Sequence, residues 1–548
     1  MYFTSSILCM VAMAYARRVV HDWDIGYVES SRGLDQPAKR GVGVNGQFPL
    51  PVVEAEIGDV LVLNVHNSLD MPTSLHAHGI FQYGTNYYDG VTMTTECGIA
   101  PGASFTYEIP LDQSGTYWIH GHTNEQNYDG LRTPLVVYDR NDPYPADCEY
   151  LFAMEDWWPL TFNETYPLLT EPNPVVGLFD SPPGLLINGH PAGLTAPILF
   201  EAGKTYRIRL VAMMALPLIE FAIDDHQLQI IEVDGVLTKP YMVDVVRLAP
   251  AERVSVLVTA KETKRLNYQY HITMFGDYLP PIEGIFPSVF NGTVVYDIDA
   301  PSYVADSIPT GFLDELAIES LEDKPAFVPD HSLYFNATSG FGPDGSTFES
   351  FNQKSFVNPL VPAIFSALTT GDMAINPITY GPQTNAHVLK FGEVVEMLLW
   401  SPTNLPHPLH LHGHTFQIIE KGFTNDTTGE LRRFVPAQNS PLMRDTIFVP
   451  QEEYAVVRFK ADNPGVWNFH CHFDWHMGMG LNMVFVEAPE LMQKSLVVPD
   501  SVTEQCRLQG ISTQGNAAIS NSYNFAAAPN LPYLLVNDPL ATAASASS

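Results

Sequence analysis

Four short motifs contain ten histidines and one cysteine, which are residue types that bind transition metals. A single His-x-His pair is common in proteins, but four such motifs at matching places in two parts of one chain are not accidental. The pattern predicts a metal centre built from all four. In chain order they are His76-Ala77-His78, His120-Gly121-His122, His407-Pro408-Leu409-His410-Leu411-His412, and His470-Cys471-His472 followed by His476.

The spacing within each motif has a geometric consequence. On a β-strand, residues i and i+2 project from one face, and residue i+1 projects from the other. Each pair therefore offers two imidazoles to one cavity. Imidazole binds copper, zinc, iron and nickel, so this cavity alone does not select the metal. The four pairs are His76/His78, His120/His122, His410/His412 and His470/His472.

Cys471 selects the metal. It lies between two cluster histidines and must project to the opposite face, where it can join His407 and His476. Two imidazoles and one thiolate form a blue-copper site, whose usual weak axial ligand is methionine. The residue five positions after His476 is Leu481, while Met477 and Met479 are out of step with that position. Because the axial ligand tunes the reduction potential of the copper, we expect the loss of this ligand to raise that potential.

The segments that must position these motifs repeat one order of elements. The first runs through VLVLNV, LHAHG and PGASFTYEIP to GTYWIHGH, and the third runs through VVEMLLW, HPLHLHGH and YAVVRFKA to PGVWNFHCH. The middle segment runs through TYRIRLV and FAIDDHQLQIIEVDG to RVSVLVTA. Alternating apolar runs separated by turn residues predict β-strands in all three.

These repeats predict an all-β fold of three tandem β-sandwich domains, over roughly residues 20–140, 145–300 and 330–500. Residues 301–330 are expected to be a linker with a short helical stretch. The second domain lacks ligands, because Ala222 and Asp224 stand where the third domain has His410 and His412, when His226 is aligned with His414. The histidine cluster is therefore expected between the first and third domains.

Length and charge limit what else the chain can be. Its 548 residues exceed what one hydrophobic core supports. A net charge of −34 argues against a nucleic-acid partner, since phosphate binding needs a basic surface. Residues 1–16 have the apolar run and small-residue cleavage site of a signal peptide, which predicts a secreted protein. No other run reaches the roughly 18 apolar residues of a membrane span.

Secretion would give the asparagines and cysteines a further role. Four Asn-x-Ser/Thr sequons are candidate glycan acceptors, at Asn163, Asn291, Asn336 and Asn425. Apart from Cys9 and Cys471, three cysteines remain, so at most one disulfide can form among them. Residues 507–548 are rich in Ala, Ser and Asn and are expected to be partly disordered.

The motifs and the phrases around them resemble the multicopper oxidases, the family of laccases, ferroxidases and ascorbate oxidases. The resemblance covers nearly all of residues 20–500, through LHAHGIFQ, GTYWIHGHT, HPLHLHGHTFQ, MRDT and FKADNPGVWNFHCHFDWH. These sequence segments are most similar to those of fungal pigment-pathway oxidases and yeast iron-uptake ferroxidases. The resemblance implies three cupredoxin-like Greek-key domains and a coupling of four one-electron oxidations to the reduction of O₂ to water.

The resemblance also implies four copper ions and their ligands. His407, Cys471 and His476 would hold the type 1 copper, and His76 and His410 the type 2 copper. One type 3 copper would be held by His78, His120 and His472, and the other by His122, His412 and His470.

Residues outside the motifs match the family as well. Asp89 matches an acid beside the copper cluster, and Asp474 matches an acid that ferroxidases carry as Glu. Either carboxylate could relay the protons that O₂ reduction consumes. Cys97 and Cys506 match the laccase disulfide that joins the first domain to the tail, which leaves Cys148 as an odd thiol that we expect to be buried. His414 is expected to be structural.

The sequence leaves the substrate open. We favour a laccase-like oxidase of small phenols, such as polyketide or naphthol pigment precursors, because these sequence segments resemble those of the pigment-pathway enzymes. The alternative is a ferroxidase, since Asp180 and Asp277 fall near places where such relatives carry acids. The loop RRFVPAQNSPLMRDT argues against it, because no carboxylate lies between Glu430 and Asp445. A non-enzymatic copper or electron carrier would need only the type 1 site, so the complete histidine cluster argues against that class.

Overall fold

The computed structural model describes residues 16–35, 37–172, 184–275, 288–311, 313–342, 345–403, 405–424, 431–435 and 440–529. Most of its regular elements are strands, as the sequence predicts. Some of the predicted features lie outside the described residues. These are the first fifteen residues of the expected signal peptide, Asp180, Asp277, Asn425 and the tail beyond residue 529.

The first sandwich consists of two four-stranded sheets, ordered β2-β1-β4-β6 and β3-β8-β7-β5. Burial alternates along β6, as expected for a strand with one face on the core and one toward solvent. The elements are β1 (Arg18–Ser30), β2 (Lys39–Val44), β3 (Val53–Glu56), β4 (Val60–Asn67), β5 (Leu75–His78), η1 (Asn86–Tyr88), β6 (Ser104–Pro110), β7 (Gly115–Gly121) and β8 (Arg132–Tyr138).

The second sandwich has a seven-stranded sheet, β11-β10-β9-β13-β18-β15-β16, and a five-stranded sheet, β12-β20-β19-β14-β17. Its elements are β9 (Cys148–Trp157), α1 (Phe162–Thr170), β10 (Gly184–Ile187), β11 (His190–Pro191), η2 (Ala192–Leu194), β12 (Ile198–Leu199), β13 (Thr205–Ala212), β14 (Leu218–Ile223), β15 (Leu228–Val233), β16 (Val236–Val243), β17 (Val245–Leu248), β18 (Arg253–Thr259), β19 (Tyr268–Phe275) and β20 (Ser288–Val295). The segment that follows contains the single-turn helix η3 (Glu315–Ala317).

The third sandwich pairs a sheet ordered β22-β21-β24-β30-β26-β27, with β28 added to β26, with a sheet ordered β23-β32-β31-β25-β29. Short helices follow its strands at the C-terminal end. The elements are β21 (His331–Phe341), β22 (Thr347–Phe351), α2 (Ala363–Thr369), η4 (Gly371–Ile375), η5 (Pro377–Tyr380), β23 (His387–Leu389), β24 (Val394–Trp400), β25 (His407–Leu411), β26 (Phe416–Thr424), β27 (Leu431–Phe434), β28 (Met443–Arg444), β29 (Thr446–Val449), β30 (Glu453–Lys460), β31 (Gly465–Cys471), α3 (Asp474–Gly478), β32 (Asn482–Glu487), α4 (Pro489–Ser495) and α5 (Asp500–Leu508).

The three sandwiches share one topology. In each, the first strand pairs in parallel with a strand of its own sheet: β1 with β4, β9 with β13, and β21 with β24. Each opposite sheet also contains one parallel pair: β3 with β8, β12 with β20, and β23 with β32. The repeated order of sequence segments therefore corresponds to a repeated strand arrangement.

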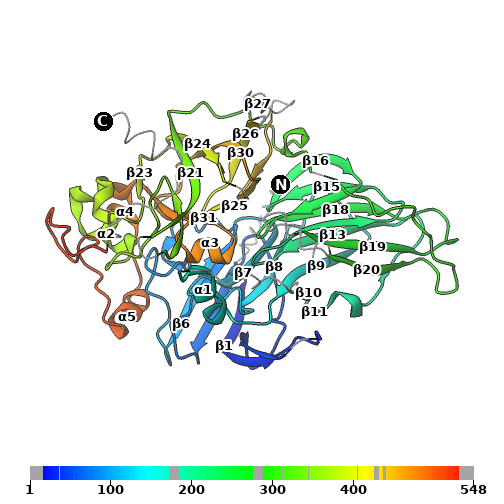
Figure 1. Cartoon of the computed structure of the whole chain (residues 1–548), viewed down its shortest axis with the longest axis horizontal. Helices are drawn as coiled ribbons and strands as arrows, with labels where there is room; N and C mark the ends of the chain where they lie inside the picture. The colour runs from blue at the N-terminus through cyan, green and yellow to red at the C-terminus, as the bar shows by residue number, and fades with distance from the viewer. Residues whose placement is uncertain are drawn as a thin grey trace, which may run out of the picture.

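The sandwiches pack closely on one another. In Figure 1 the blue first sandwich lies below, the green second at the right, and the yellow-to-orange third above them. One buried apolar cluster joins the cores of the second and third sandwiches, and another joins the first to the helices of the third. Strand β7 of the first sandwich also contacts β13 and β18 of the second. Each sandwich therefore touches the other two.

Several strands are buried along their whole length, among them β5, β7, β25 and β31. Every residue of β7 and of β31 is buried, unlike the alternating strands at the surface. A strand is buried on both faces when one face packs inside its own sandwich and the other faces a neighbouring layer. Strands β7 and β31 both carry His-x-His motifs, so the motifs lie inside the molecule.

The C-terminal segment is attached to the first sandwich. A disulfide joins Cys97 to Cys506 on α5, as the resemblance implied, and Gln509 donates to the Cys97 carbonyl at 3.0 Å. Our expectation for Cys148 is wrong, because this thiol is exposed. It is the first residue of β9, and burial increases only toward the other end of that strand.

Surface features of the described residues bear on the other sequence predictions. Asn163 and Asn291 are exposed, but Asn336 is only 4% exposed and cannot carry a glycan in this fold. No helix in the described part of the chain is long and apolar enough to cross a membrane.

Candidate metal centre

The four motifs lie on two pairs of antiparallel strands. In the first sandwich β5 pairs with β7, so that His76 stands opposite His120. In the third, β25 pairs with β31, so that His410 stands opposite His470. Each pairing sets two motifs side by side on one sheet. All eight cluster histidines are at most 7% exposed.

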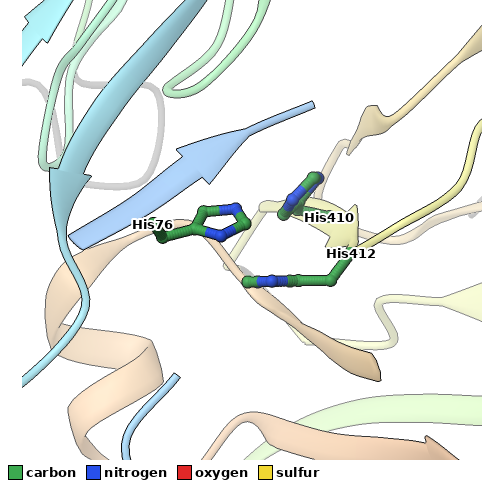
Figure 2. Close-up of side chains that lie close together, drawn as sticks. All are labelled: His76, His410 and His412. Carbon is green, nitrogen blue, oxygen red and sulfur yellow. The ribbon is translucent and has the colours of Figure 1, made fainter. Parts of the chain in front are cut away.

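The eight imidazoles meet between these sheets. His76 and His412 have ring centroids 4.0 Å apart, and His78 stacks on His410 at 3.8 Å. Figure 2 shows the rings of His76, His410 and His412 directed toward one another, and their ligand nitrogens lie within 4.8 Å. His76 and His78 are thus brought against His410 and His412, which lie more than 300 positions further along the chain.

The expected type 3 sets are also brought together. The Nε2 atom of His470 lies 3.4 Å from that of His122 and 3.0 Å from that of His412. In the other set, the ring centroid of His472 lies 5.1 Å from that of His78 and 5.3 Å from that of His120.

Hydrogen bonds orient the rings and leave nitrogens directed at the cluster. The Nδ1 atoms of His76, His410 and His470 donate to the carbonyls of Asp89, Asp445 and Cys471 at 2.8–2.9 Å. The Nε2 atoms of His76, His120 and His410 are buried and have no hydrogen-bond partner. Buried polar atoms are almost always satisfied, so a metal ion is a fitting partner for these nitrogens.

Burial favours the neutral, metal-binding form of His120, His122, His412 and His470. Burial, with a smaller contribution from neighbouring histidines, lowers the pKa of His120, His122 and His412 well below the usual value. Burial also lowers the pKa of His470 to about 3.

On the opposite face of β31, Cys471 meets the two remaining histidines. Its Sγ lies 3.6 Å from Nδ1 of His407 and 3.6 Å from Nδ1 of His476, and these two nitrogens are 3.1 Å apart. Burial lowers the pKa of His476 to about 3. Three converging ligand atoms of this kind fit a blue copper.

We still expect no methionine ligand at the axial position of the site formed by His407, Cys471 and His476. Leu481 is fully buried, and its carbonyl accepts a hydrogen bond from the Cys471 amide at 3.0 Å. Met477 instead lines a cavity beside His122. A leucine in place of the usual axial methionine would favour a copper of raised potential.

Comparisons with known proteins agree with this geometry. Residues 28–142, 149–283 and 356–491 match three family models, each described as multicopper oxidase. The chain is 36% identical to the iron multicopper oxidase fer1 of Mycosarcoma maydis, over 94% of this chain and 88% of that protein. It is also 36% identical to the iron transport multicopper oxidase fio1 of Schizosaccharomyces pombe, over 96% of this chain and 85% of that protein.

The chain is a multicopper oxidase.

Solved structures agree with this assignment. The crystal structure of Fet3p, described as a multicopper oxidase that functions in iron import, matches with a TM-score of 0.85 and 29% identity, over 94% of this chain and 100% of that chain. A laccase from Botrytis aclada matches with a TM-score of 0.70 and 25% identity, over 90% and 92%. The three sandwiches are therefore cupredoxin-like domains, as predicted, and the oxidase uses copper and O₂.

The two predicted carboxylates, Asp89 and Asp474, are both buried in this multicopper oxidase. Asp89 is fully buried, accepts from Nδ1 of His412 at 2.9 Å and lies 3.2 Å from Nδ1 of His76, so it contacts histidines of both domains. Asp474 accepts two bonds from the Asn127 amide, at 3.0 and 3.2 Å. Burial raises the pKa of Asp474 well above its usual value, which favours the protonated form of this carboxyl.

Sequence reasoning missed Asp445. Its Oδ1 lies 3.2 Å from Nε2 of His78, and its carbonyl accepts from His410. Burial would raise the pKa of Asp445, but the charge of Arg253, together with His78 and the hydrogen bonds that the carboxylate accepts, holds it well below the usual range. The phrase MRDT contains Asp445 and resembled the family, which was the available signal, but nothing in its spacing indicates contact with His78.

Other predicted residues lie away from the copper ligand atoms. His414 donates from Nδ1 to the His412 carbonyl at 3.0 Å and lies 3.1 Å from Glu487. In the second domain, Asp224 accepts from His271, and His226 contacts Tyr296. Within the described residues, every group of three or more candidate metal ligands lies in the first and third domains.

A cavity of about 390 Å³ reaches the cluster. It is lined by His122, Asn468, Asn482, Glu125, Tyr166 and Met477, among others. Because His122 is a cluster histidine, this cavity opens onto the histidine cluster.

Proposed function

We propose that this multicopper oxidase is a ferroxidase, which couples oxidation of four Fe²⁺ and uptake of four protons to reduction of one O₂ to two waters. This reverses the preference for phenols that the motif wording suggested. The preference for phenols rested on a few short sequence segments, whereas the comparisons align nearly the whole chain with oxidases whose names specify iron. A net charge of −34 also suits a cationic substrate.

One observation carries the proposal. The chain is 36% identical, over more than nine-tenths of its length, to two oxidases whose names specify iron. Among solved structures it is more similar to Fet3p, with 29% identity and a TM-score of 0.85, than to the laccase, with 25% and 0.70. The loop before Met443 has no carboxylate, so iron must be bound by other acids. We propose Asp180 and Asp277, both outside the described residues, for this role.

We also propose four copper ions per chain. A type 1 copper would be held by His407, Cys471 and His476, a type 2 copper by His76 and His410, and two type 3 coppers by the remaining six histidines of the cluster. The bound copper would supply one-electron transfer and the site of O₂ reduction. The chain's own groups would orient the imidazoles through Asp89 and hold a proton on the Asp474 carboxyl.

The test is O₂ uptake with Fe²⁺ and, side by side, with a panel of naphthols and simple phenols. We expect kcat/KM for Fe²⁺ to exceed that for the best phenol by at least about tenfold, which corresponds to about 1.4 kcal/mol. A phenol with the larger kcat/KM would return the assignment to a laccase-like oxidase.

Cys471→Ser serves as the control for both substrate classes. Serine cannot supply the thiolate of a blue copper, so the variant should lose its blue colour and all turnover. Turnover that survives in this variant would show that electrons do not enter through Cys471.

We propose, finally, that the protein is secreted after removal of residues 1–16. The Cys97–Cys506 disulfide supports this, since disulfides persist in oxidising compartments. The mature protein should begin at Arg17 and lose mass on enzymatic deglycosylation. An intact N-terminus in the exported protein, or a mass that deglycosylation leaves unchanged, would contradict the corresponding part.

A further inference from the structure

The second domain reaches the histidine cluster through one side chain, although it supplies no copper ligand. Arg253 is the first residue of β18 and is fully buried. Its Nη1 and Nη2 donate to Oδ1 and Oδ2 of Asp445 at 2.8 and 2.6 Å. This two-point geometry fixes both the position and the plane of the carboxylate.

Asp445 in turn contacts histidines of both copper-binding domains. Its Oδ1 accepts from Nε2 of His78, at 3.2 Å, which leaves Nδ1 of His78 as the nitrogen without a hydrogen bond. Its carbonyl accepts from Nδ1 of His410 at 2.9 Å, which leaves Nε2 free. Which ring nitrogen of a histidine binds a metal is set by the hydrogen bond that the other nitrogen makes.

Groups from all three domains hold Arg253 in this position. Its Nε donates to the carbonyl of Thr116 in the first domain at 3.1 Å, and Nη1 donates to the carbonyl of Ala251 at 3.0 Å. Asp234 accepts both the Arg253 amide, at 2.8 Å, and Nε of Arg444 in the third domain, at 2.9 Å. The guanidinium therefore has little freedom to move.

The backbone of the first domain is shaped around this pair. Gly79 directly follows His78 and has a φ of +87°. A Cβ added there would lie 2.6 Å from Nη2 of Arg253 and 2.8 Å from Oδ2 of Asp445. The chain thus continues from a cluster histidine into direct contact with the ion pair.

We propose that Arg253 is a positioning residue of the histidine cluster, which acts through Asp445 to aim His78 and His410 at their copper ions. The domain without ligands would then control how firmly the other two hold copper. This rests on the proposed assignment of these histidines to cluster coppers, but not on the choice of Fe²⁺ as substrate.

The test compares Arg253→Lys with the control Arg207→Lys. Lysine keeps the charge but cannot make the two-point contact. Arg207 is a second buried arginine of the same domain, 5% exposed, which donates to Asp142 and Tyr144 away from the copper ligands. Holoproteins are titrated with a copper chelator, and the blue absorbance and the electron paramagnetic resonance signal of type 2 copper are followed separately.

We expect Arg253→Lys to release cluster copper at about 10–100-fold less chelator than the wild type, because groups that orient metal ligands typically contribute that factor to affinity. The blue absorbance should remain, since the Cys471 thiol projects from the opposite face of β31, where it meets His407 and His476. Arg207→Lys should behave as the wild type. Wild-type chelator resistance in Arg253→Lys, or equal loss in both variants, would overturn the proposal.

A second variant covers the case that Arg253→Lys fails to fold. Arg253→Met with Asp445→Asn removes both charges, so no unpaired charge is buried. We expect it to fold with a blue site and the same weakened cluster, and wild-type resistance here would also overturn the proposal. A wild type that lacks any type 2 signal would instead overturn the copper assignment.

Discussion

At the scale of single residues, the tripeptide His470-Cys471-His472 belongs to both groups of candidate copper ligands. Alternation along β31 sends the thiol to one face and both imidazoles to the other. The Cys471 carbonyl also accepts a hydrogen bond from Nδ1 of His470 at 2.9 Å. The thiol and the cluster are therefore joined by a covalent path and by a hydrogen bond, which suits electron transfer between them.

The axial position gives a prediction about potential. Leu481→Met should lower the reduction potential of the type 1 copper, because a thioether can coordinate where leucine cannot. The two side chains have similar volumes, so the fold should be kept at a cost below about 1.5 kcal/mol. Redox titration of the blue absorbance measures the effect. An unchanged potential would mean that residue 481 does not occupy the axial position.

Glu349 on β22 gives a prediction about pH. It is 1% exposed, and burial raises its pKa to about 7, against about 4.3 for glutamate in an unfolded chain. Between these values the folded state binds more protons than the unfolded state, so stability falls as pH rises through this window. Glu349→Gln should therefore gain stability relative to the wild type from about pH 4 to about pH 8, by about 3 kcal/mol.

The readout for Glu349 is the difference in Tm between variant and wild type across that pH range. Glu322→Gln is the matched control, because the Glu322 side chain is 74% exposed, and its difference should stay flat. A Glu349→Gln difference that is equally flat would contradict the assignment of this titration to Glu349.

At the scale of elements, helix α5 depends on the disulfide for its attachment to the first domain. Replacing Cys97 and Cys506 together by serine should lower the free energy of unfolding by about 2–4 kcal/mol. It should also expose α5 to proteolysis, while the blue colour remains because the type 1 ligands lie within the third domain. Thermal unfolding and limited proteolysis measure these effects. Loss of the blue colour together with α5 would contradict this independence.

At the scale of the whole molecule, the net charge of −34 should guide a cationic substrate. If Fe²⁺ is the substrate, its kcat/KM should fall about two- to tenfold as salt screens this field, because steering decreases with ionic strength. A neutral phenol should show no such change. Steady-state rates at low and physiological salt provide the measurement, and a salt-independent rate for Fe²⁺ would contradict steering.

The copper ligands could be predicted from sequence because their geometry is local. A His-x-His pair on a strand shares one face wherever the strand lies, and the residue between the histidines takes the other face. The three repeats could be recognised for the same reason, since the alternation of apolar and polar residues along a strand is visible in the sequence. The strand pairing of His76 with His120 and of His410 with His470 follows from that shared topology.

Only the tertiary structure decided which distant groups surround those ligands. The contact of Arg253 with Asp445 joins residues 192 positions apart in different domains, and that of Asp445 with His78 spans 367. Burial of Asn336 and exposure of Cys148 likewise depend on packing rather than on local pattern. Periodicity within a strand fixes the direction of each side chain, but only the docking of the domains determines what that side chain meets.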